Sequence, residues 1–90
     1  MKPEISLIVT NWNGVDLLRE CLPTILEAVE FDQNHSYEVM VIDDCSTDNS
    51  IEILTNEFPT VRTEKTPRNL GFQKANNYAV KLVESKIVMP

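Results

Sequence analysis

The sequence predicts an α/β fold in which a mostly parallel sheet lies between two helical layers, a three-layer αβα arrangement within a single domain of residues 1–90. Short, nearly continuous apolar runs at residues 5–9, 37–42 and 87–89 alternate with segments of helical periodicity. That alternation is typical of βαβ units, whose parallel strands are covered on both faces. Ninety residues leave room for one domain only.

The first half of the chain predicts a strand, a helix and a second strand. Residues 5–9 form a β-branched run that ends at a polar segment, which is typical of a buried strand. Pro23 lies inside the following helical pattern and should bend that helix near Leu22. A polar linker then leads to the second strand at 37–42. The expected inward positions of the helix are Leu18, Cys21, Leu22, Ile25, Leu26 and Val29.

The second half predicts two more helices and two more strands. Either Ser46 or Thr47 is expected to cap a helix that Pro59 ends. A weak strand is expected at 60–64, a turn at 67–71, and the last strand at 87–89. The expected inward positions are Ile51, Leu54 and Phe58 in the second helix and Phe72, Ala75, Ala79, Leu82 and Val83 in the third.

Composition excludes several classes of protein. Eight basic and 14 acidic residues give a net charge of −6, which argues against a nucleic-acid partner. Two cysteines and one histidine, dispersed along the chain, do not form a zinc motif or a disulfide scaffold. No apolar run approaches the roughly 20 residues that cross a bilayer. The expected location is the cytoplasm, with the inner face of the membrane as the alternative for a longer protein.

Ligands of parallel sheets bind beyond the carboxyl ends of the strands, so the residues that follow the first two strands matter most. After the first strand come Thr10, Asn11, Trp12, Asn13 and Gly14, a segment with a hydroxyl, two amides and an aromatic ring that are suited to a planar base and its ribose. The alternative is a polar turn that caps the next helix, with Trp12 filling a gap.

After the second strand come two adjacent carboxylates, Asp43 and Asp44, within the segment DDCSTD. Neighbouring carboxylates repel, and a ligand or cation that shares them relieves the repulsion. An aspartate here can accept hydrogen bonds from a base or a ribose hydroxyl. The alternative is ordinary helix-start chemistry, because Asp and Ser are good N-caps.

A third polar segment covers residues 68–77. Gly71 permits a tight turn or a close backbone approach, and the helix that follows it offers an N-terminus suited to a phosphate. Arg68 and Lys74 can add cationic contacts to a diphosphate. The alternative is a loop-to-helix junction with two solvated cations.

Together the segments LIVTNWNG, VMVIDDCSTDNS and PRNLGFQKANN resemble the family 2 glycosyltransferases in order and spacing. The resemblance covers essentially all 90 residues and corresponds to the nucleotide-sugar-binding half of that family's Rossmann-like GT-A fold. These motifs look most similar to those of the bacterial branch that acts in cell-surface polysaccharide synthesis and rhamnosyl transfer.

The resemblance implies that the nucleotide lies at the strand ends. By this resemblance Thr10, Asn11 and Trp12 line the base and ribose pocket, and Asp44 is the hydrogen-bond partner of the base. Asp43 then shapes the turn, with Ser46 as a helix cap.

Later in the chain, Asn69, Gly71, Phe72 and Asn77 match the family's next motif. The resemblance makes Asn77 a residue that orders the sugar-phosphate side of the pocket, and Arg68 a candidate contact to the diphosphate.

The implied function is the donor-binding part of an enzyme that transfers a sugar from a nucleotide-diphosphate sugar, UDP- or dTDP-linked, to a hydroxyl acceptor in cell-surface polysaccharide or glycan synthesis. The family's Mg²⁺ or Mn²⁺ is held by a D-x-D motif just beyond residue 90, and the general base lies further on. No catalytic and no metal-binding residue is therefore expected in this chain, which resembles an N-terminal piece without transfer activity of its own. Apolar surface left uncovered should favour a homo-oligomer.

Two other functions remain open on the sequence alone. One is an inert or interaction-only fragment without catalysis, which differs from the first hypothesis only in whether nucleotide binding survives. The other is a receiver-like signalling module, which also combines βα units with acidic strand ends. Against the receiver, the acidic pair follows the second strand.

Overall fold

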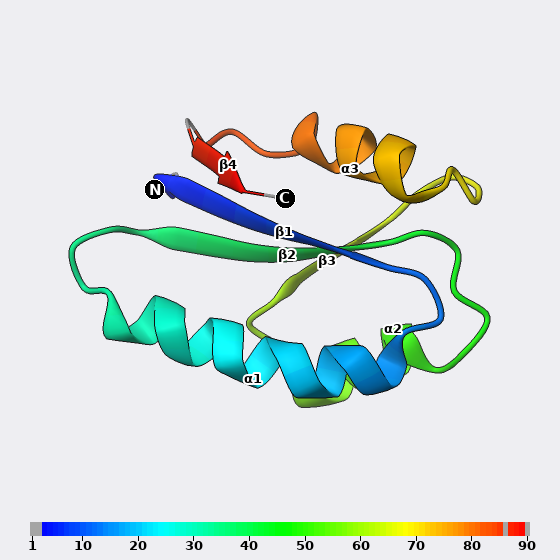
Figure 1. The fold of residues 1–90 in the computed structure, drawn as a ribbon, viewed down its shortest axis with the longest axis horizontal. Helices are drawn as coiled ribbons and strands as arrows, with labels where there is room; N and C mark the ends of the chain where they lie inside the picture. Colours follow the sequence, from blue (N-terminus) through cyan, green and yellow to red (C-terminus); the bar gives the residue numbers. More distant parts are fainter. Residues whose placement is uncertain (1–2, 86, 90) are drawn as a thin grey trace.

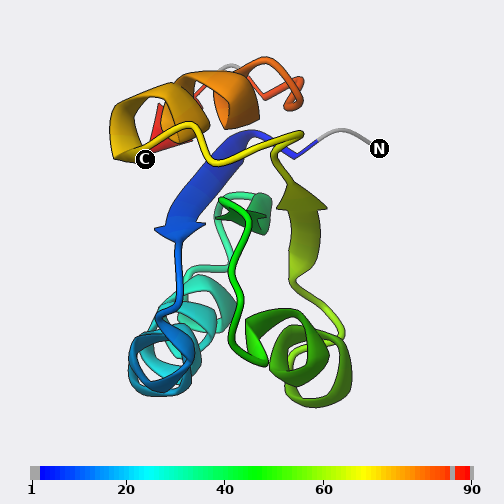
Figure 2. The same cartoon turned by 90° about the vertical axis from the view of Figure 1, so that its right-hand side faces the viewer.

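The computed structural model describes residues 3–85 and the backbone of residues 87–89. In chain order the elements are β1 (Ile5–Asn11), α1 (Val15–Phe31), β2 (Tyr37–Asp43), α2 (Ser50–Glu57), β3 (Arg62–Lys65), α3 (Phe72–Val80) and β4 (Ile87–Met89). The four strands form one parallel sheet in the order β3-β2-β1-β4. Helices α1 and α2 cover one face and α3 covers the other (Figures 1 and 2), which confirms the predicted three-layer αβα fold.

Strand β2 lies inside the sheet, and its side chains alternate between the two helical layers. Val39 and Val41 pack in one cluster with Leu18 and Leu22 of α1. Met40 and Ile42 point to the opposite face and pack with Ala79 of α3. Because both faces are covered, the strand is apolar along nearly its whole length, as parallel sheets require.

Helix α1 buries Leu18 and Leu22 and stays one helix through Pro23. Pro23 is exposed, so its ring lies on the solvent side, and the helix shows no interruption there. The prediction that Cys21 points inward is wrong, because Cys21 lies on the exposed side of the helix.

The structure corrects four further details. Helix α2 begins at Ser50, so neither Ser46 nor Thr47 caps it; the Asp43 carboxylate accepts the Ser46 amide at 3.0 Å and keeps the chain in a loop. Phe72, predicted to point inward, is 71% exposed at the start of α3. Helix α3 ends at Val80, before the last apolar positions assigned to it, and the third strand is shifted to Arg62–Lys65.

Within the described residues, no helix is long and apolar enough to cross a membrane. In this part of the chain the sheet is bounded by β3 on one side and β4 on the other. The predicted self-association stays a prediction.

Candidate functional site

A cavity of about 370 Å³ lies beyond the carboxyl ends of β1 and β2. The parallel register brings Asn11 beside Asp43, so the segments that follow the two strands start side by side. The cavity is lined by Thr10, Trp12, Asp44, Asn69, Gly71 and Phe72, all of them predicted site residues. Its size and its position match those of small-molecule sites in parallel sheets.

Asp44 forms the back of this cavity and is 2% exposed. Its Oδ1 accepts the Thr66 hydroxyl at 2.8 Å and the Leu70 amide at 2.8 Å. Its Oδ2 accepts the Gly71 amide at 2.9 Å. The side-chain amide of Asn69 donates to the Asp44 carbonyl at 3.1 Å, so the whole 66–71 segment is fastened to this one residue.

These bonds set the ionisation of Asp44. Burial by itself raises the pKa of the carboxyl, but the hydrogen bonds from the Leu70 amide, the Thr66 hydroxyl and the Gly71 amide outweigh it, and the pKa lies below its usual value. The group is therefore an anion at neutral pH. A carboxylate has about four acceptor positions, and donors from the described residues fill three of them, which leaves one position on Oδ2 without a donor from this part of the chain.

The Asp44 contacts change one expectation about the start of α3. The amides of Leu70 and Gly71, predicted to favour a phosphate, already bind a carboxylate of the chain itself. Gly71 has φ +84 and ψ 161, a conformation that is essentially restricted to glycine. The glycine is thus needed for the turn that aims these amides at Asp44.

Asn11 and Asp43 lie beneath the cavity rather than in its wall. Both are buried, and the Asn11 Nδ2 donates to Asp43 Oδ1 at 2.8 Å. Ser46 donates to the same carboxylate through its hydroxyl at 2.6 Å and its amide at 3.0 Å. Asp43 therefore shapes the turn, as the family resemblance implied, and has no exposed oxygen to offer a ligand.

The side walls carry exposed aromatic and hydroxyl groups. The Trp12 ring is 59% exposed and the Phe72 ring 71% exposed, although both line the cavity. Thr10 donates its hydroxyl to Asn76 Oδ1 at 2.7 Å, which ties β1 to α3. Asn77, which was predicted to face the pocket, is exposed on α3 and does not line the cavity.

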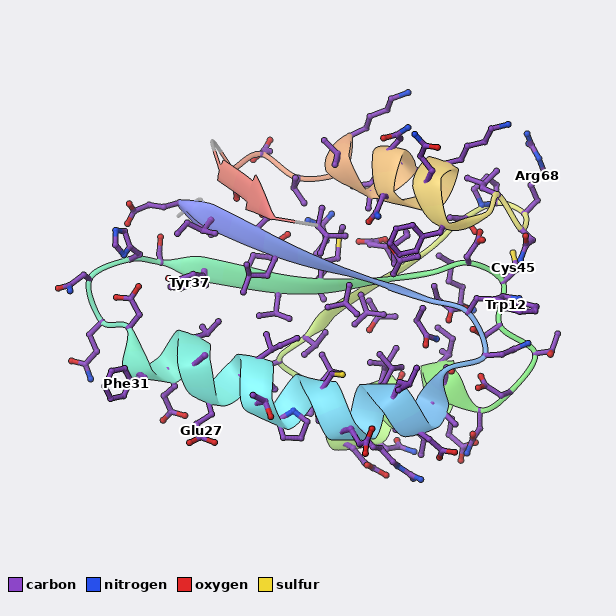
Figure 3. The ribbon with its side chains drawn as sticks, in the orientation of Figure 1. Trp12, Glu27, Phe31, Tyr37, Cys45 and Arg68 are labelled. Carbon is purple, nitrogen blue, oxygen red and sulfur yellow. The ribbon has the colours of Figure 1, made fainter. Side chains whose placement is uncertain are left out.

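Arg68 lies near the cavity but outside its lining. Figure 3 shows Trp12, Cys45 and Arg68 at the same end of the molecule, with the Arg68 side chain extending into solvent. Arg68 is exposed, and no salt bridge among the described residues involves it. Its guanidinium is available to an anion that enters from outside.

Sequence reasoning missed Thr66 and Asn76, which hold Asp44 and Thr10 in place. Asn76 stands next to the predicted Asn77, and helical periodicity from the buried Ala75 and Ala79 places Asn76 nearer the sheet. No sequence signal identifies Thr66, because its bond to Asp44 spans 22 residues of chain.

The described residues do not offer a metal site. No three His, Cys, Asp or Glu side chains within them converge on a common position. Asp43 and Asp44, which are adjacent in the sequence, accept hydrogen bonds from donors of the chain. A divalent cation therefore does not fit the donor set described here.

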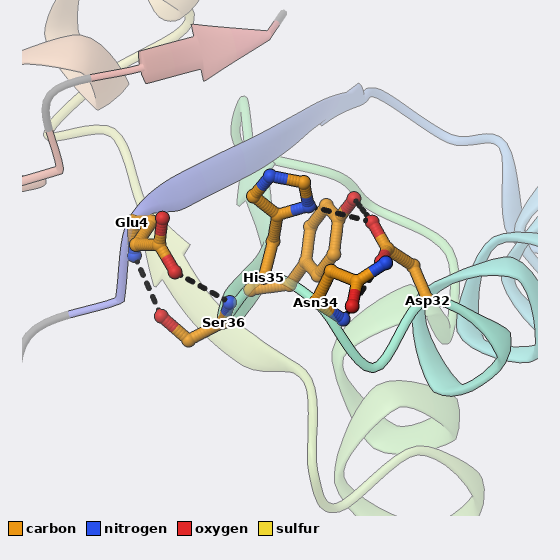
Figure 4. A network of polar contacts seen from close by, with 6 residues as sticks. Glu4, Asp32, Asn34, His35 and Ser36 are labelled. Carbon is orange, nitrogen blue, oxygen red and sulfur yellow. Dashed lines mark hydrogen bonds and ion pairs between the residues drawn. The ribbon is translucent and has the colours of Figure 1, made fainter.

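A polar network and a second cavity lie at the opposite end of the molecule. The Asp32 carboxylate accepts the Tyr37 hydroxyl at 2.6 Å, and His35 Nδ1 lies 3.0 Å from it (Figure 4). The Tyr37 bond, then the His35 bond, then the Asn34 amide lower the pKa of Asp32 to about 2. Asp32 in turn raises the pKa of His35. This network joins α1 to β2, and the adjacent cavity of about 520 Å³ lies at the amino ends of the strands.

Comparison with known proteins identifies the family. Residues 6–90 match the family described as Glycosyl transferase family 2, which is nearly the whole chain. The chain belongs to this glycosyltransferase family. The poly(ribitol-phosphate) beta-glucosyltransferase of Bacillus spizizenii (strain ATCC 23059 / NRRL B-14472 / W23) is 29% identical over 91 residues, which cover 96% of this chain and 14% of that protein.

Solved structures agree with the family assignment. S. aureus TarS 1-349 in complex with UDP-GlcNAc is 31% identical with a TM-score of 0.77, over 98% of this chain and 25% of that one. The mannosyltransferase PcManGT from Pyrobaculum calidifontis, in complex with GDP-Man and Mn²⁺, is 25% identical with a TM-score of 0.73, over 98% of this chain and 26% of that one. The chain thus spans about a quarter or less of the length of these relatives.

Proposed function

We propose that this chain forms the donor-nucleotide site of a glycosyltransferase that moves a sugar from a nucleotide-diphosphate sugar to a hydroxyl acceptor. The observation that supports it most is the cavity itself, in which an anionic acceptor stands at the back and exposed aromatic rings stand at the sides. An aromatic ring offers a stacking surface to a base, and stacking contributes about 1–3 kcal/mol per base.

The free acceptor position on Asp44 favours one class of base. Uracil and thymine present a single N–H between two carbonyls, which one oxygen position can accept. Guanine presents two neighbouring donors, and binding both requires two free acceptor positions, whereas Oδ1 is already filled by Thr66 and Leu70. We therefore infer a UDP- or dTDP-linked donor, and the TarS complexes with UDP and UDP-GlcNAc support that inference. The GDP-Man complex of PcManGT is the competing case.

A divalent cation, Mg²⁺ or Mn²⁺, is proposed for the complete reaction on the basis of the Mn²⁺ in the PcManGT complex. When bound, such an ion neutralises the diphosphate as it leaves. The described residues contribute to the nucleotide side only: Asp44 holds the base, Trp12 covers it, and Arg68 is free to approach the diphosphate. We further propose that the product is a cell-surface glycan. The proposed location is the cytoplasm, where nucleotide sugars are used.

Calorimetric titration of the chain with UDP, dTDP, GDP and CDP tests this function. UDP and dTDP should bind, and CDP should bind about tenfold or more weakly, because the cytosine ring lacks the N–H that a charged acceptor receives. Removal of Mg²⁺ with a chelator should leave the affinity of the chain for UDP nearly unchanged, because no three His, Cys, Asp or Glu side chains of the described residues converge to hold a metal ion.

The matched variants are Trp12→Ala and Phe31→Ala. Phe31 is 89% exposed at the far end of α1, so its loss removes an aromatic ring without touching the cavity. UDP affinity should fall in Trp12→Ala and stay at the wild-type value in Phe31→Ala. A folded chain that binds none of the four nucleotides contradicts the proposal and favours an interaction-only domain.

A further inference from the structure

Asn13 is a residue whose role the nucleotide site does not yet explain. It follows Trp12 and has φ +51, in the left-handed region that non-glycine residues seldom enter. Asparagine tolerates this conformation better than most residues because its short side chain can bond locally. In this chain the Asn13 side chain bonds elsewhere, to a segment more than 30 residues away.

The Asn13 side chain gathers the loop that follows β2. Its Oδ1 accepts the Thr47 amide at 2.6 Å, the Asp48 amide at 3.2 Å and the Thr47 hydroxyl at 3.3 Å. Its backbone amide donates to the Ser46 hydroxyl at 2.9 Å. The side chain and the backbone amide of Asn13 therefore both join the turn after β1 to the loop after β2.

Capping of α1 does not account for these contacts. The helix begins at Val15 after Gly14, and no side chain caps it from the N-cap position. The Val15 amide is bonded instead to Asp48 Oδ2 at 3.3 Å. The Asn13 oxygen points to the 46–48 loop and not to the first turn of α1.

Trp12 lies between two such anchors. On one side Asn11 is 4% exposed and donates to Asp43 Oδ1 at 2.8 Å and to Ser46 Oγ at 3.2 Å. On the other side stands Asn13. The Trp12 ring itself is 59% exposed, so its orientation depends on the backbone that the two asparagines hold.

We propose that Asn13 is a positioning residue that holds the Trp12 ring at the cavity by joining the β1–α1 turn to the β2–α2 loop. The consequence for ligands rests on the proposed nucleotide function. Fixing the ring in advance removes an ordering cost from binding, and the cost of immobilising one side chain corresponds to about a three- to tenfold change in affinity. The positioning itself is independent of any ligand.

The test compares Asn13→Gly, Asn13→Ala and Asn13→Asp with Asn34→Ala as the matched control in the full 90-residue chain. Glycine removes the acceptor and keeps the left-handed backbone, alanine removes the acceptor and adds strain, and aspartate keeps an acceptor oxygen. Trp12 is the only tryptophan, so steady-state fluorescence anisotropy and acrylamide quenching report its mobility without a ligand. Far-UV circular dichroism verifies that each variant is folded.

Asn13→Gly and Asn13→Ala should both lower the anisotropy and increase quenching, while Asn13→Asp and Asn34→Ala should match the wild type. UDP affinity should fall about three- to tenfold in the glycine variant. A folded glycine variant with wild-type anisotropy and quenching overturns the positioning role. The role is also overturned if the Trp12 ring is as mobile in Asn13→Asp as it is in Asn13→Ala. If wild type binds no UDP, the proposed function fails, while the anisotropy of the variants still decides the role of Asn13.

Discussion

Replacing Asp44 should damage the fold as well as the nucleotide site. In Asp44→Ala three hydrogen bonds to a buried carboxylate disappear, those from Thr66 Oγ1 at 2.8 Å and from the amides of Leu70 and Gly71 at 2.8 and 2.9 Å. Each bond to a charged group contributes about 1.5–3 kcal/mol, and water entering the cavity recovers part of the loss. We expect the free energy of unfolding to fall by about 3–5 kcal/mol, a large share of the stability of a small domain.

The assay is urea unfolding followed by far-UV circular dichroism, with Asp44→Asn and Asp16→Asn beside the alanine variant. Asp44→Asn keeps one acceptor oxygen, so its free energy of unfolding should fall less than that of Asp44→Ala. Asp16 is an exposed acid in the first turn of α1, and its neutralisation should cost about 1 kcal/mol or less. If Asp44→Ala unfolds within about 1 kcal/mol of the Asp16→Asn control, the hydrogen bonds to Asp44 do not contribute the expected stability.

The pH dependence gives a second view of the same residue. The pKa of Asp44 is lower in the folded chain than the usual 3.8. The ionised carboxylate therefore contributes its full share to the free energy of unfolding above pH 3.8, and this share is lost as the pH falls through the folded pKa. The wild type should therefore lose stability in acid more steeply than Asp44→Asn.

Three other changes have expected outcomes. Leu22→Ala should lower the free energy of unfolding by about 2–5 kcal/mol, because the side chain is completely buried, and Leu17→Ala, 63% exposed, is its control in the same urea assay. Gly71→Ala should cost about 1–3 kcal/mol of stability, since φ +84 with ψ 161 strains any residue with a Cβ, although open space surrounds the site. Tyr37→Phe should raise the pKa of Asp32 from about 2 toward 3.8 in an NMR titration, because the hydroxyl is the main cause of its lowering; the stability that depends on this carboxylate is present above pH 3.8 and disappears toward pH 2.

The layers of the fold follow from apolar patterning. The run at β2 faces helices on both sides, and this explains why an unbroken apolar segment predicted a buried parallel strand. The errors have two causes. Cys21 fits the apolar spacing of the helix but lies on its exposed side. Helix α2 starts late because a neighbouring polar group, the Asp43 carboxylate, binds Ser46.

The site was predictable in outline for a related reason. Parallel strands deliver the residues that follow them to one edge, so Thr10, Trp12 and Asp44 could be grouped from the sequence alone. The division of roles among them could not, because it depends on long-range hydrogen bonds. Nothing local in the sequence distinguishes an Asp43 that supports the turn from an Asp44 that lines the cavity.

The central claim is that the cavity at the carboxyl ends of β1 and β2 binds a nucleotide, and backbone-amide NMR spectra of the labelled chain titrated with UDP test it most directly. We expect saturable shifts of the Trp12 indole and of the Thr10, Asn69 and Gly71 amides, with the amides around Asp32 unchanged. Shifts that gather instead around Leu26 and Tyr37, in the larger cavity at the amino ends of the strands, would contradict the claim. So would a well-dispersed spectrum that does not change at saturating UDP.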